Sequence, residues 1–190
     1  MNCRHCQTPL LQTMLDLRSA PPSNAFLDDV SLHHPEIWYP LRVFVCEHCW
    51  LVQTEDFAHA DQLFSSEYAY FSGFSTTWVD HCRHYVDQVT GRFQLDSTSQ
   101  VVEVAANDGT LLQFFLQEGI PCVGIEPTAS TAAAAKSKGI PIIEEFFGTK
   151  TARQLVEKQG RADLVVANNV LAHVPDINDF MKGVAILLKT

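Results

Sequence analysis

Four cysteines in two C-x-x-C pairs are the residues of this chain with the most recognisable chemistry. Cys3 and Cys6 form the first pair and Cys46 and Cys49 the second, with residues 7–45 between them. Two such pairs supply the four thiolates of a tetrahedral zinc site with bonds of about 2.3 Å. A redox pair normally begins a helix of a βαβ unit, and this region predicts none. Structural Zn2+ is therefore the prediction, and two unrelated pairs are the alternative.

A second group of chemical interest is the turn within VVEVAANDGTLLQFF, residues 101–115. An apolar run, an acidic turn and another apolar run predict a strand that enters a helix, as in nucleotide-binding sheets. Against the pattern acidic-x-Gly-x-Gly-x-Gly, Glu103 is the acid, while Ala105 and Asn107 replace two glycines before Asp108 and Gly109. Asparagine tolerates left-handed backbone angles, so it can still make the turn. A loop with one glycine suits a ligand that lacks a pyrophosphate.

Further candidate ligand residues follow the next three predicted strands. Glu126 and Pro127 come about 20 residues after the loop, where a Rossmann sheet places an acid on ribose hydroxyls. Phe146 and Phe147 follow the third strand and are candidate walls for an adenine ring, and Asn168 follows the fourth. Open α/β sheets bind ligands at the carboxyl ends of their strands, so we expect these side chains to meet there.

The elements that position these residues divide the chain into three parts. Residues 1–60 are rich in turn formers and predict a small β-rich module, with YPLRVFVC as a strand. Residues 61–97 predict a linking helical segment, with Gly91 as the end of its helix. Residues 98–190 alternate four strands (QVVEVA, PCVGIE, IPIIEE, ADLVVAN) with helices over 110–118, 129–137, 149–158 and 177–188. The predicted fold class is α/β, a Rossmann-like parallel sheet with fewer strands than a complete one.

Composition and charge exclude several functions. Hydrophobic residues make up 46% and charged residues 18% of the 190 residues, which allows a packed core. The net charge of −9 and the absence of a Lys/Arg cluster argue against nucleic-acid binding. No apolar run is long enough to span a bilayer, and MNCRHC does not resemble a signal peptide. We therefore expect a cytoplasmic protein with no membrane partner.

With these motifs in order, the sequence resembles class I S-adenosylmethionine-dependent methyltransferases, specifically the nucleotide-linked deoxysugar C-methyltransferases. The resemblance covers nearly the whole chain and rests on CRHCQTPL, LDLRSAPPSNAFL, YPLRVFVCEHCWLVQ, EYAYFSGFS, VVEVAANDGTLL, GIEPT and ADLVVANNVLAHVPD. It implies S-adenosylmethionine and Zn2+ as cofactors and a small-molecule sugar nucleotide as partner. It makes Tyr68 and Tyr70, in the substrate segment, and His173 candidates for the active site. Aromatic packing and a helix start are the alternative interpretations of these three residues.

The resemblance also implies a mechanism and a missing part. A carbon beside a ketone can be deprotonated, and the enolate can then attack a sulfonium methyl group. Full-length relatives carry a C-terminal half with a Glu-His pair whose histidine is thought to be the base. We expect this chain to be a fragment that is inactive or nearly so on its own, with an exposed sheet edge that makes a homo-oligomer possible. A non-catalytic zinc-stabilised binding module and a nicotinamide oxidoreductase are the competing hypotheses.

Overall fold

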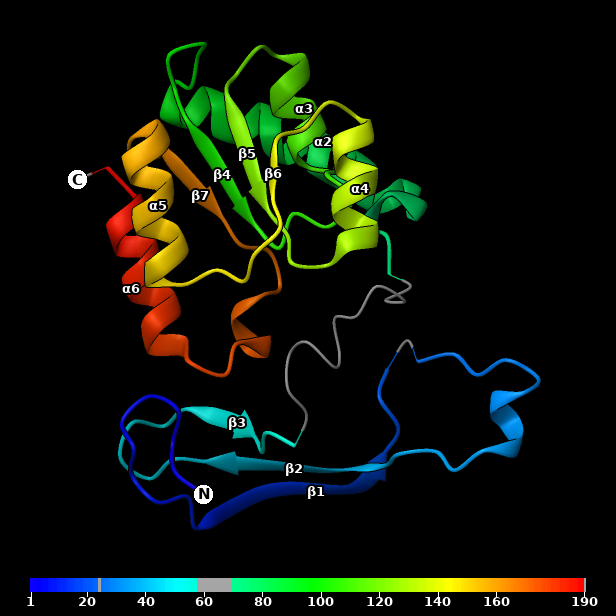
Figure 1. Ribbon diagram of the computed structural model, residues 1–190. Coiled ribbons are helices and arrows are strands. Elements are labelled where there is room, and N and C mark those ends of the chain that lie inside the picture. The colour runs from blue at the N-terminus through cyan, green and yellow to red at the C-terminus, as the bar shows by residue number, and fades with distance from the viewer. Residues whose placement is uncertain (24, 58–69, 190) are drawn as a thin grey trace. The chain divides into compact units, whose positions relative to one another are not determined.

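The computed structural model describes residues 1–23, 25–57 and 70–189 (Figure 1). The chain divides into two compact units, Met1–Tyr70 with Pro175–Asn178 and Phe71–Val174 with Asp179–Thr190. Within the described residues, no helix combines the length and the apolar character that a membrane crossing requires.

The first unit is built on a three-stranded antiparallel sheet in the order β1-β2-β3. The strands are β1 (Gln12–Ala20), β2 (Tyr39–Val45) and β3 (Val52–Thr54), with a short 3-10 helix, η1 (Ser31–His33), between the first two. The predicted strand YPLRVFVC is confirmed as β2. The buried core of this unit is small and consists of Cys3, Leu10, Phe44 and Cys46. A module with so few buried side chains needs another source of stability.

The second unit contains a parallel sheet of four strands in the order β6-β5-β4-β7. These are β4 (Val101–Val104), β5 (Cys122–Ile125), β6 (Ile142–Ile143) and β7 (Leu164–Val166). The first strand of this unit, β4, has β5 on one side and β7 on the other. The chain therefore reverses direction across the sheet at β4, which is the topological switch point of a Rossmann-like fold. The four predicted strands and the parallel α/β fold class are confirmed.

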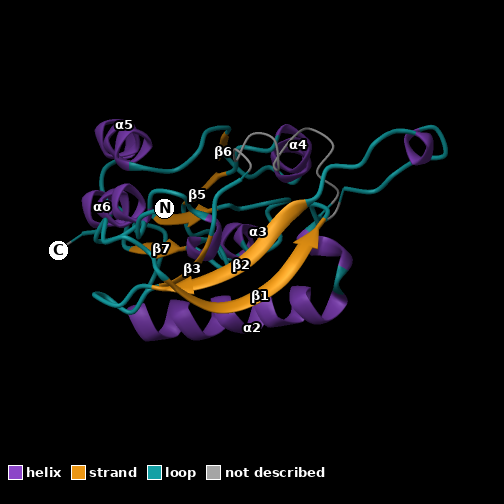
Figure 2. Cartoon of the chain, turned by 90° about the horizontal axis from the view of Figure 1, so that it is seen from below, coloured by secondary structure: helices purple, strands orange, loops and turns teal. Residues whose placement is uncertain are grey.

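Helices cover both faces of this sheet (Figure 2). α2 (Thr76–Phe93) and α3 (Leu112–Gln117) share one apolar cluster with Val101 and Cys122. α5 (Thr149–Gln159) and α6 (Ile177–Leu187) share the other with Val102 and Val123. Because successive strand residues point to opposite faces, the buried run of β4 supplies both clusters. The remaining elements are α4 (Ala129–Ser137), which packs beside β6, and the 3-10 helices η2 (Ser72–Phe74) and η3 (Leu171–His173).

The prediction that Gly91 ends the helix of the linking segment was wrong. α2 continues to Phe93, and Gln94 adopts the left-handed conformation (φ 53°) that closes it, with its N–H bonded to the carbonyl oxygen of Thr90. Leu95 is buried directly after this turn and packs in the apolar core. Tertiary packing of Leu95 therefore decides where the helix ends, and the local preference of glycine does not.

Candidate functional site

The four cysteines of the first unit converge on one point. Their Sγ atoms all lie within 4.8 Å of one another, and none of the four forms a disulfide. The Cys3–Cys49 and Cys6–Cys46 Sγ distances are 3.5 and 3.6 Å. Tetrahedral coordination with bonds of about 2.3 Å requires S–S edges of about 3.8 Å, so the cluster has the size of a zinc site. Hydrogen bonds from the side chain and then the backbone of Thr8 lower the pKa of Cys6 to about 5, which favours the thiolate form.

Two matching turns present these thiolates. Gln7 N–H donates to the Cys3 carbonyl at 3.0 Å, and Trp50 N–H donates to the Cys46 carbonyl at 2.9 Å. Gln7 and Trp50 both have left-handed backbone angles, φ 62° and 64°. The two C-x-x-C pairs therefore form turns of the same backbone conformation. Sequence reasoning missed Gln53, a buried amide that donates to Cys3 Sγ at 3.4 Å and so orients a ligand of the cluster.

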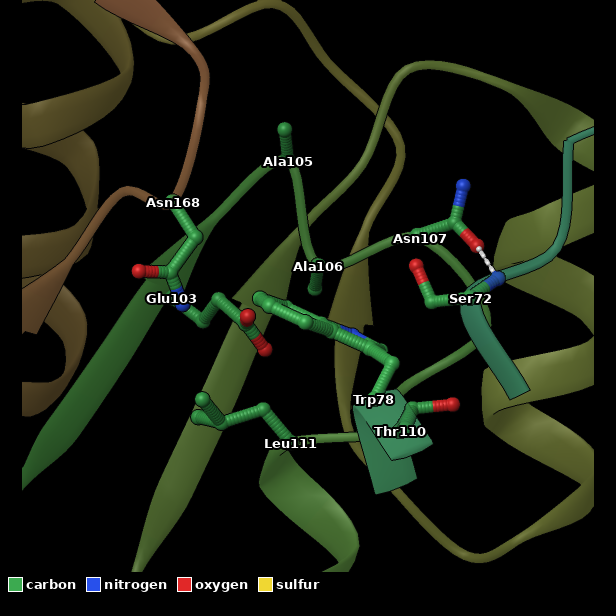
Figure 3. Close-up of a pocket in the computed structure, with 9 residues that line it drawn as sticks. All are labelled: Ser72, Trp78, Glu103, Ala105, Ala106, Asn107, Thr110, Leu111 and Asn168. Atoms are coloured by element: carbon green, nitrogen blue, oxygen red, sulfur yellow. Dashed lines mark hydrogen bonds between the residues drawn. The ribbon is translucent and has the colours of Figure 1, made fainter. Parts of the chain in front are cut away.

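The second unit has a small cavity of about 40 Å3 at the switch point of its sheet (Figure 3). This volume is far below the roughly 300–1,000 Å3 of small-molecule sites, so the cavity fits no more than one end of a larger ligand. The cavity is lined by Ser72, Trp78, Glu103, Ala105, Ala106, Asn107, Thr110, Leu111 and Asn168. The strand-end residues Ala105 and Asn168 come from β4 and β7, the two strands between which the topology reverses. Of the residues that the strand-end argument groups together, Glu103, Ala105, Asn107 and Asn168 line this cavity. Its lining does not include Glu126, Pro127, Phe146 or Phe147.

Glu103 is the most unusual residue of the cavity. Its side chain is 6% exposed, and Oε2 has no hydrogen-bond partner among the described residues. Burial, followed by the negative charges of Glu126 and Asp108, raises the pKa of Glu103 well above its ordinary value. A buried acceptor without a partner is unfavourable by about 1–3 kcal/mol, and such groups concentrate at functional sites. A ligand that places a cationic donor beside Oε2 would remove this cost.

Glu126 holds the ends of two strands together. It follows β5 and is 5% exposed; Oε2 accepts from Asn107 N–H at 2.8 Å and Oε1 accepts from Thr128 N–H at 2.9 Å. Each carboxylate oxygen has a second lone pair, so both can still accept a ligand hydroxyl. The carboxylate is thus held in one orientation, while the ribose role stays a prediction.

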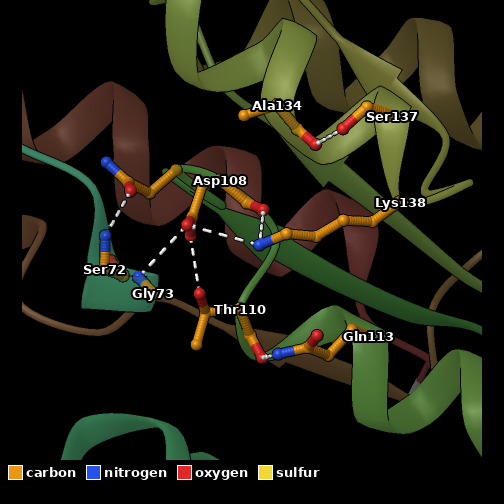
Figure 4. Close-up of polar contacts among 9 residues, drawn as sticks. Ser72, Gly73, Asp108, Thr110, Gln113, Ala134, Ser137 and Lys138 are labelled. Carbon is orange, nitrogen blue, oxygen red and sulfur yellow. Dashed lines mark hydrogen bonds and ion pairs between the residues drawn. The ribbon is translucent and has the colours of Figure 1, made fainter. Parts of the chain in front are cut away.

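Asn107 and Asp108 hold the segment before α2 against the loop, as Figure 3 shows for Asn107 and Figure 4 for Asp108. Asn107 Oδ1 accepts from Ser72 N–H at 2.9 Å, and Asp108 Oδ2 accepts from Gly73 N–H at 3.1 Å. Asp108 also accepts from the Thr110 hydroxyl at 2.6 Å and pairs with Lys138 at 3.3 Å. The side chains that replace or follow the expected glycines therefore hold two chain segments in register. The predicted left-handed conformation of Asn107 is confirmed at φ 51°.

Gly109 is the loop position where a side chain is excluded. Its φ is +74°, and a Cβ atom would lie 2.3 Å from Ile140 Cδ1 and 3.1 Å from Ala135 Cβ. We expect Gly109→Ala to lower the free energy of unfolding by about 2–4 kcal/mol, because strain and overlap add. Gly119→Ala is the matched control, since Gly119 has φ +72° and nothing within 4 Å of its Cβ position. Urea titration should show a clearly smaller loss for the control; equal losses would mean that the Ile140 overlap is relieved by relaxation.

The remaining predicted site residues lie in different environments. Phe147 packs in the core against Phe180, with ring centroids 5.2 Å apart, whereas Phe146 is 50% exposed. Of the two phenylalanines offered for an adenine wall, the accessible one is Phe146. Pro127 is half-buried after β5. His173 is exposed in η3 and Tyr70 is 50% exposed; neither lines the cavity. Tyr68 lies outside the described residues.

Sequence reasoning missed five residues that line the cavity: Ser72, Trp78, Ala106, Thr110 and Leu111. Thr110 and Leu111 belong to the NDGTLL stretch already singled out, so the loop could have been extended by two residues. From the sequence, Trp78 is interpreted as one more apolar residue of a helix, and Ser72 is interpreted as a loop residue. For Ser72 and Trp78, the available signal is the helix N-cap between them, Ser75, which marks where α2 begins. Ser75 Oγ accepts a hydrogen bond from Trp78 N–H at 3.2 Å.

Comparisons with known proteins show two families that parts of this chain resemble. Residues 3–64 match a family described as a putative zinc binding domain, and residues 102–190 match one described as a methyltransferase domain. The two matches, a zinc module followed by a methyltransferase domain, agree with the resemblance that the motifs predict.

Among individual relatives, C-methyltransferase NovU of Streptomyces niveus is 31% identical over 98% of this chain and 44% of that protein. Ubiquinone biosynthesis O-methyltransferase of Bradyrhizobium sp. (strain ORS 278) is 27% identical over 65% of this chain and 57% of that protein. This chain thus spans about half the length of these curated relatives. The solved structure of magnesium protoporphyrin IX methyltransferase from Synechocystis PCC 6803 is 16% identical over 58% of this chain and 52% of that chain, with a TM-score of 0.47.

Proposed function

We propose that the second unit binds S-adenosylmethionine and that the protein is a methyltransferase. The observation that carries this proposal is the unpartnered Oε2 of Glu103 in a cavity at the switch point of the sheet. The match of residues 102–190 to a methyltransferase domain supports the same conclusion.

Charge favours this ligand over a dinucleotide. Glu103, Asp108 and Glu126 are all buried around the loop, so the region is acidic. S-adenosylmethionine carries a sulfonium, an ammonium and a carboxylate group, so its net charge is positive and an acidic pocket attracts it, whereas the pyrophosphate of a dinucleotide would be repelled. This argument weighs against the nicotinamide oxidoreductase hypothesis.

The residues of this chain would bind and orient the methyl donor. Glu103 and the neighbouring backbone of Ala105 would face the donor's cationic end, and Glu126 would accept from ribose hydroxyls, with Phe146 near adenine. Gly109 and Asp108 would keep the loop in shape. When bound, S-adenosylmethionine supplies an electrophilic methyl group on sulfur.

The acceptor we propose is a nucleotide-linked keto-deoxysugar, methylated at carbon through an enolate. The similarity to a protein named C-methyltransferase supports carbon as the methylated atom, and the EYAYFSGFS motif supports a sugar acceptor. Tyr68, Tyr70 and His173 remain proposals for contacts with the acceptor.

For the first unit we propose structural Zn2+ bound by Cys3, Cys6, Cys46 and Cys49. The four Sγ atoms fit a tetrahedral ion in their distances, and the match of residues 3–64 to a putative zinc binding domain supports this assignment.

The donor site is tested by calorimetric titration of S-adenosylhomocysteine into the zinc-loaded chain, with NADH as the competing ligand. We expect S-adenosylhomocysteine alone to bind. Glu126→Ala should weaken it by roughly 10- to 100-fold, because two charge-assisted hydrogen bonds to ribose are lost. Glu126→Gln keeps an acceptor and should lose less.

Two controls make the result specific. Glu157→Ala removes an exposed acid of α5 and should leave affinity unchanged. Because Glu126 also accepts from the loop backbone, thermal melts must show that each variant remains folded. Binding of NADH in preference to S-adenosylhomocysteine, or undiminished binding by Glu126→Ala, would contradict the proposed site.

A further inference from the structure

Trp78 is placed against the donor cavity by the start of α2. It lies in the first turn of the helix, and its ring stacks on His81 with centroids 5.1 Å apart and an interplanar angle of 26°. The ring is half-buried, packs on the apolar cluster of α2 and α3, and lines the cavity. Figure 3 shows the indole extending between Ala106 and Leu111 toward the Glu103 carboxylate.

The position of this ring is set by the loop itself. The hydrogen bonds of Asn107 to Ser72 N–H and of Asp108 to Gly73 N–H hold the residues immediately before α2. A Cβ atom on Gly73 would lie 2.6 Å from Asp108 Oδ2, so this approach is as close as a backbone without a side chain permits. The segment that begins α2 and the loop after β4 therefore form one wall, and these hydrogen bonds hold the start of α2 beside the cavity.

Two features of the cavity attract a cation. One is Glu103 Oε2, which no described residue hydrogen-bonds. The other is the indole of Trp78, whose π face is the best of the natural side chains for a positive charge, and whose effect grows as water is removed. A neutral ligand gains from the apolar contact of the ring but not from its electrostatic attraction.

We propose that Trp78 is a donor-binding residue that contacts the sulfonium end of S-adenosylmethionine and favours it over the neutral product S-adenosylhomocysteine. The inference rests on the proposed function and deepens it, because it assigns selectivity between methyl donor and product to a named side chain. A site with this preference releases its product more readily than one that binds both equally.

The test uses tryptophan fluorescence and calorimetry on the zinc-loaded chain. The chain has three tryptophans, and the other two, Trp38 and Trp50, are 55% and 73% exposed. We expect S-adenosylmethionine to change the emission of the wild-type chain and of Trp38→Phe and Trp50→Phe, and to leave that of Trp78→Phe unchanged. Trp78→Leu, which keeps an apolar side chain but no ring, should lose roughly 5- to 20-fold in affinity for S-adenosylmethionine and much less for S-adenosylhomocysteine.

The outcomes separate this inference from the proposed function. If the wild-type chain binds both ligands but the emission change persists in Trp78→Phe, or the ratio of the two affinities is unchanged in Trp78→Leu, the role of Trp78 is wrong and the donor site stands. If the wild-type chain binds neither ligand, the proposed function fails and the role of Trp78 falls with it. Thermal melts of both Trp78 variants confirm that they are folded before affinities are compared.

Discussion

Removing zinc is expected to unfold the N-terminal module while the parallel sheet keeps its structure. Among the described residues, the apolar core of this unit consists of four buried side chains, two of which belong to the proposed ligands Cys3 and Cys46. All but the last residue of β1 are exposed, so this strand contributes little apolar burial. Zinc binding in small modules is worth about 10–16 kcal/mol at neutral pH and becomes folding free energy. Losing it should therefore exceed the effect of any single core substitution.

The measurement combines metal analysis with limited proteolysis. The wild-type chain should contain one zinc ion, and Cys46→Ser or a strong chelator should release it and expose residues 1–57 to protease. Fragments that contain β4 to β7 should persist. Cys122→Ala is the control, since Cys122 is a buried cysteine of the parallel sheet and should keep the zinc. A zinc-free wild-type chain whose first unit resists protease would refute a structural metal.

Glu103→Gln is expected to stabilise the ligand-free chain at neutral pH and to weaken donor binding. Burial, then the charges of Glu126 and Asp108, raise the folded-state pKa of Glu103 above its ordinary value of 4.5. The stability contributed by its neutral form is thus fully present below about pH 4.5 and is lost as pH rises through the folded-state pKa. A glutamine is neutral throughout, so it should raise the melting temperature at pH 7–8 by roughly 5 °C, as relief of about 1–3 kcal/mol implies.

Melting curves of wild type and Glu103→Gln from pH 4 to pH 8 test this expectation. Both chains have the same zinc module, so acid-induced zinc loss cancels in their difference. That difference should shrink toward zero as pH falls to about 4.5. Glu157→Gln, at an exposed position of α5, should show no such trend. At pH 7.5 the affinity of Glu103→Gln for S-adenosylmethionine should fall about tenfold; a more stable variant with unchanged affinity would remove Glu103 from the donor site.

Much of the second unit could be predicted from its sequence, because short apolar runs typical of strands alternate there with segments whose apolar residues have helical spacing. The helix over 129–137 is found at these residues, and the four apolar runs all become strands. Strand ends define the sheet edge, so Glu103, Ala105, Asn107 and Asn168 could be grouped before any coordinates. The cysteine cluster was equally accessible, because two C-x-x-C pairs constrain their own geometry.

What the sequence did not reveal depends on contacts between distant segments. The role of Asp108 is an example: as a loop acid it suggested a ligand contact, but its oxygens are bonded to Gly73, Thr110 and Lys138. Trp78 reads as a core residue because periodicity gives the face of a helix but not the cavity on which that face opens. The packing of Phe147 on Phe180 likewise depends on α6, which follows 30 residues later in the chain, and no local pattern indicates it.

The fastening of the loop by Asn107 and Asp108 has a consequence for the thermodynamics of recognition. In a loop of three glycines the backbone is free to fluctuate, and a ligand must restrict it on arrival. Here that restriction is already imposed by hydrogen bonds to Ser72, Gly73 and Glu126. The conformational entropy of this loop is therefore lost during folding, and a ligand binds to a loop that is already ordered. Association should be limited by diffusion and orientation rather than by rearrangement, and hydrogen exchange at this loop should be slow even without ligand.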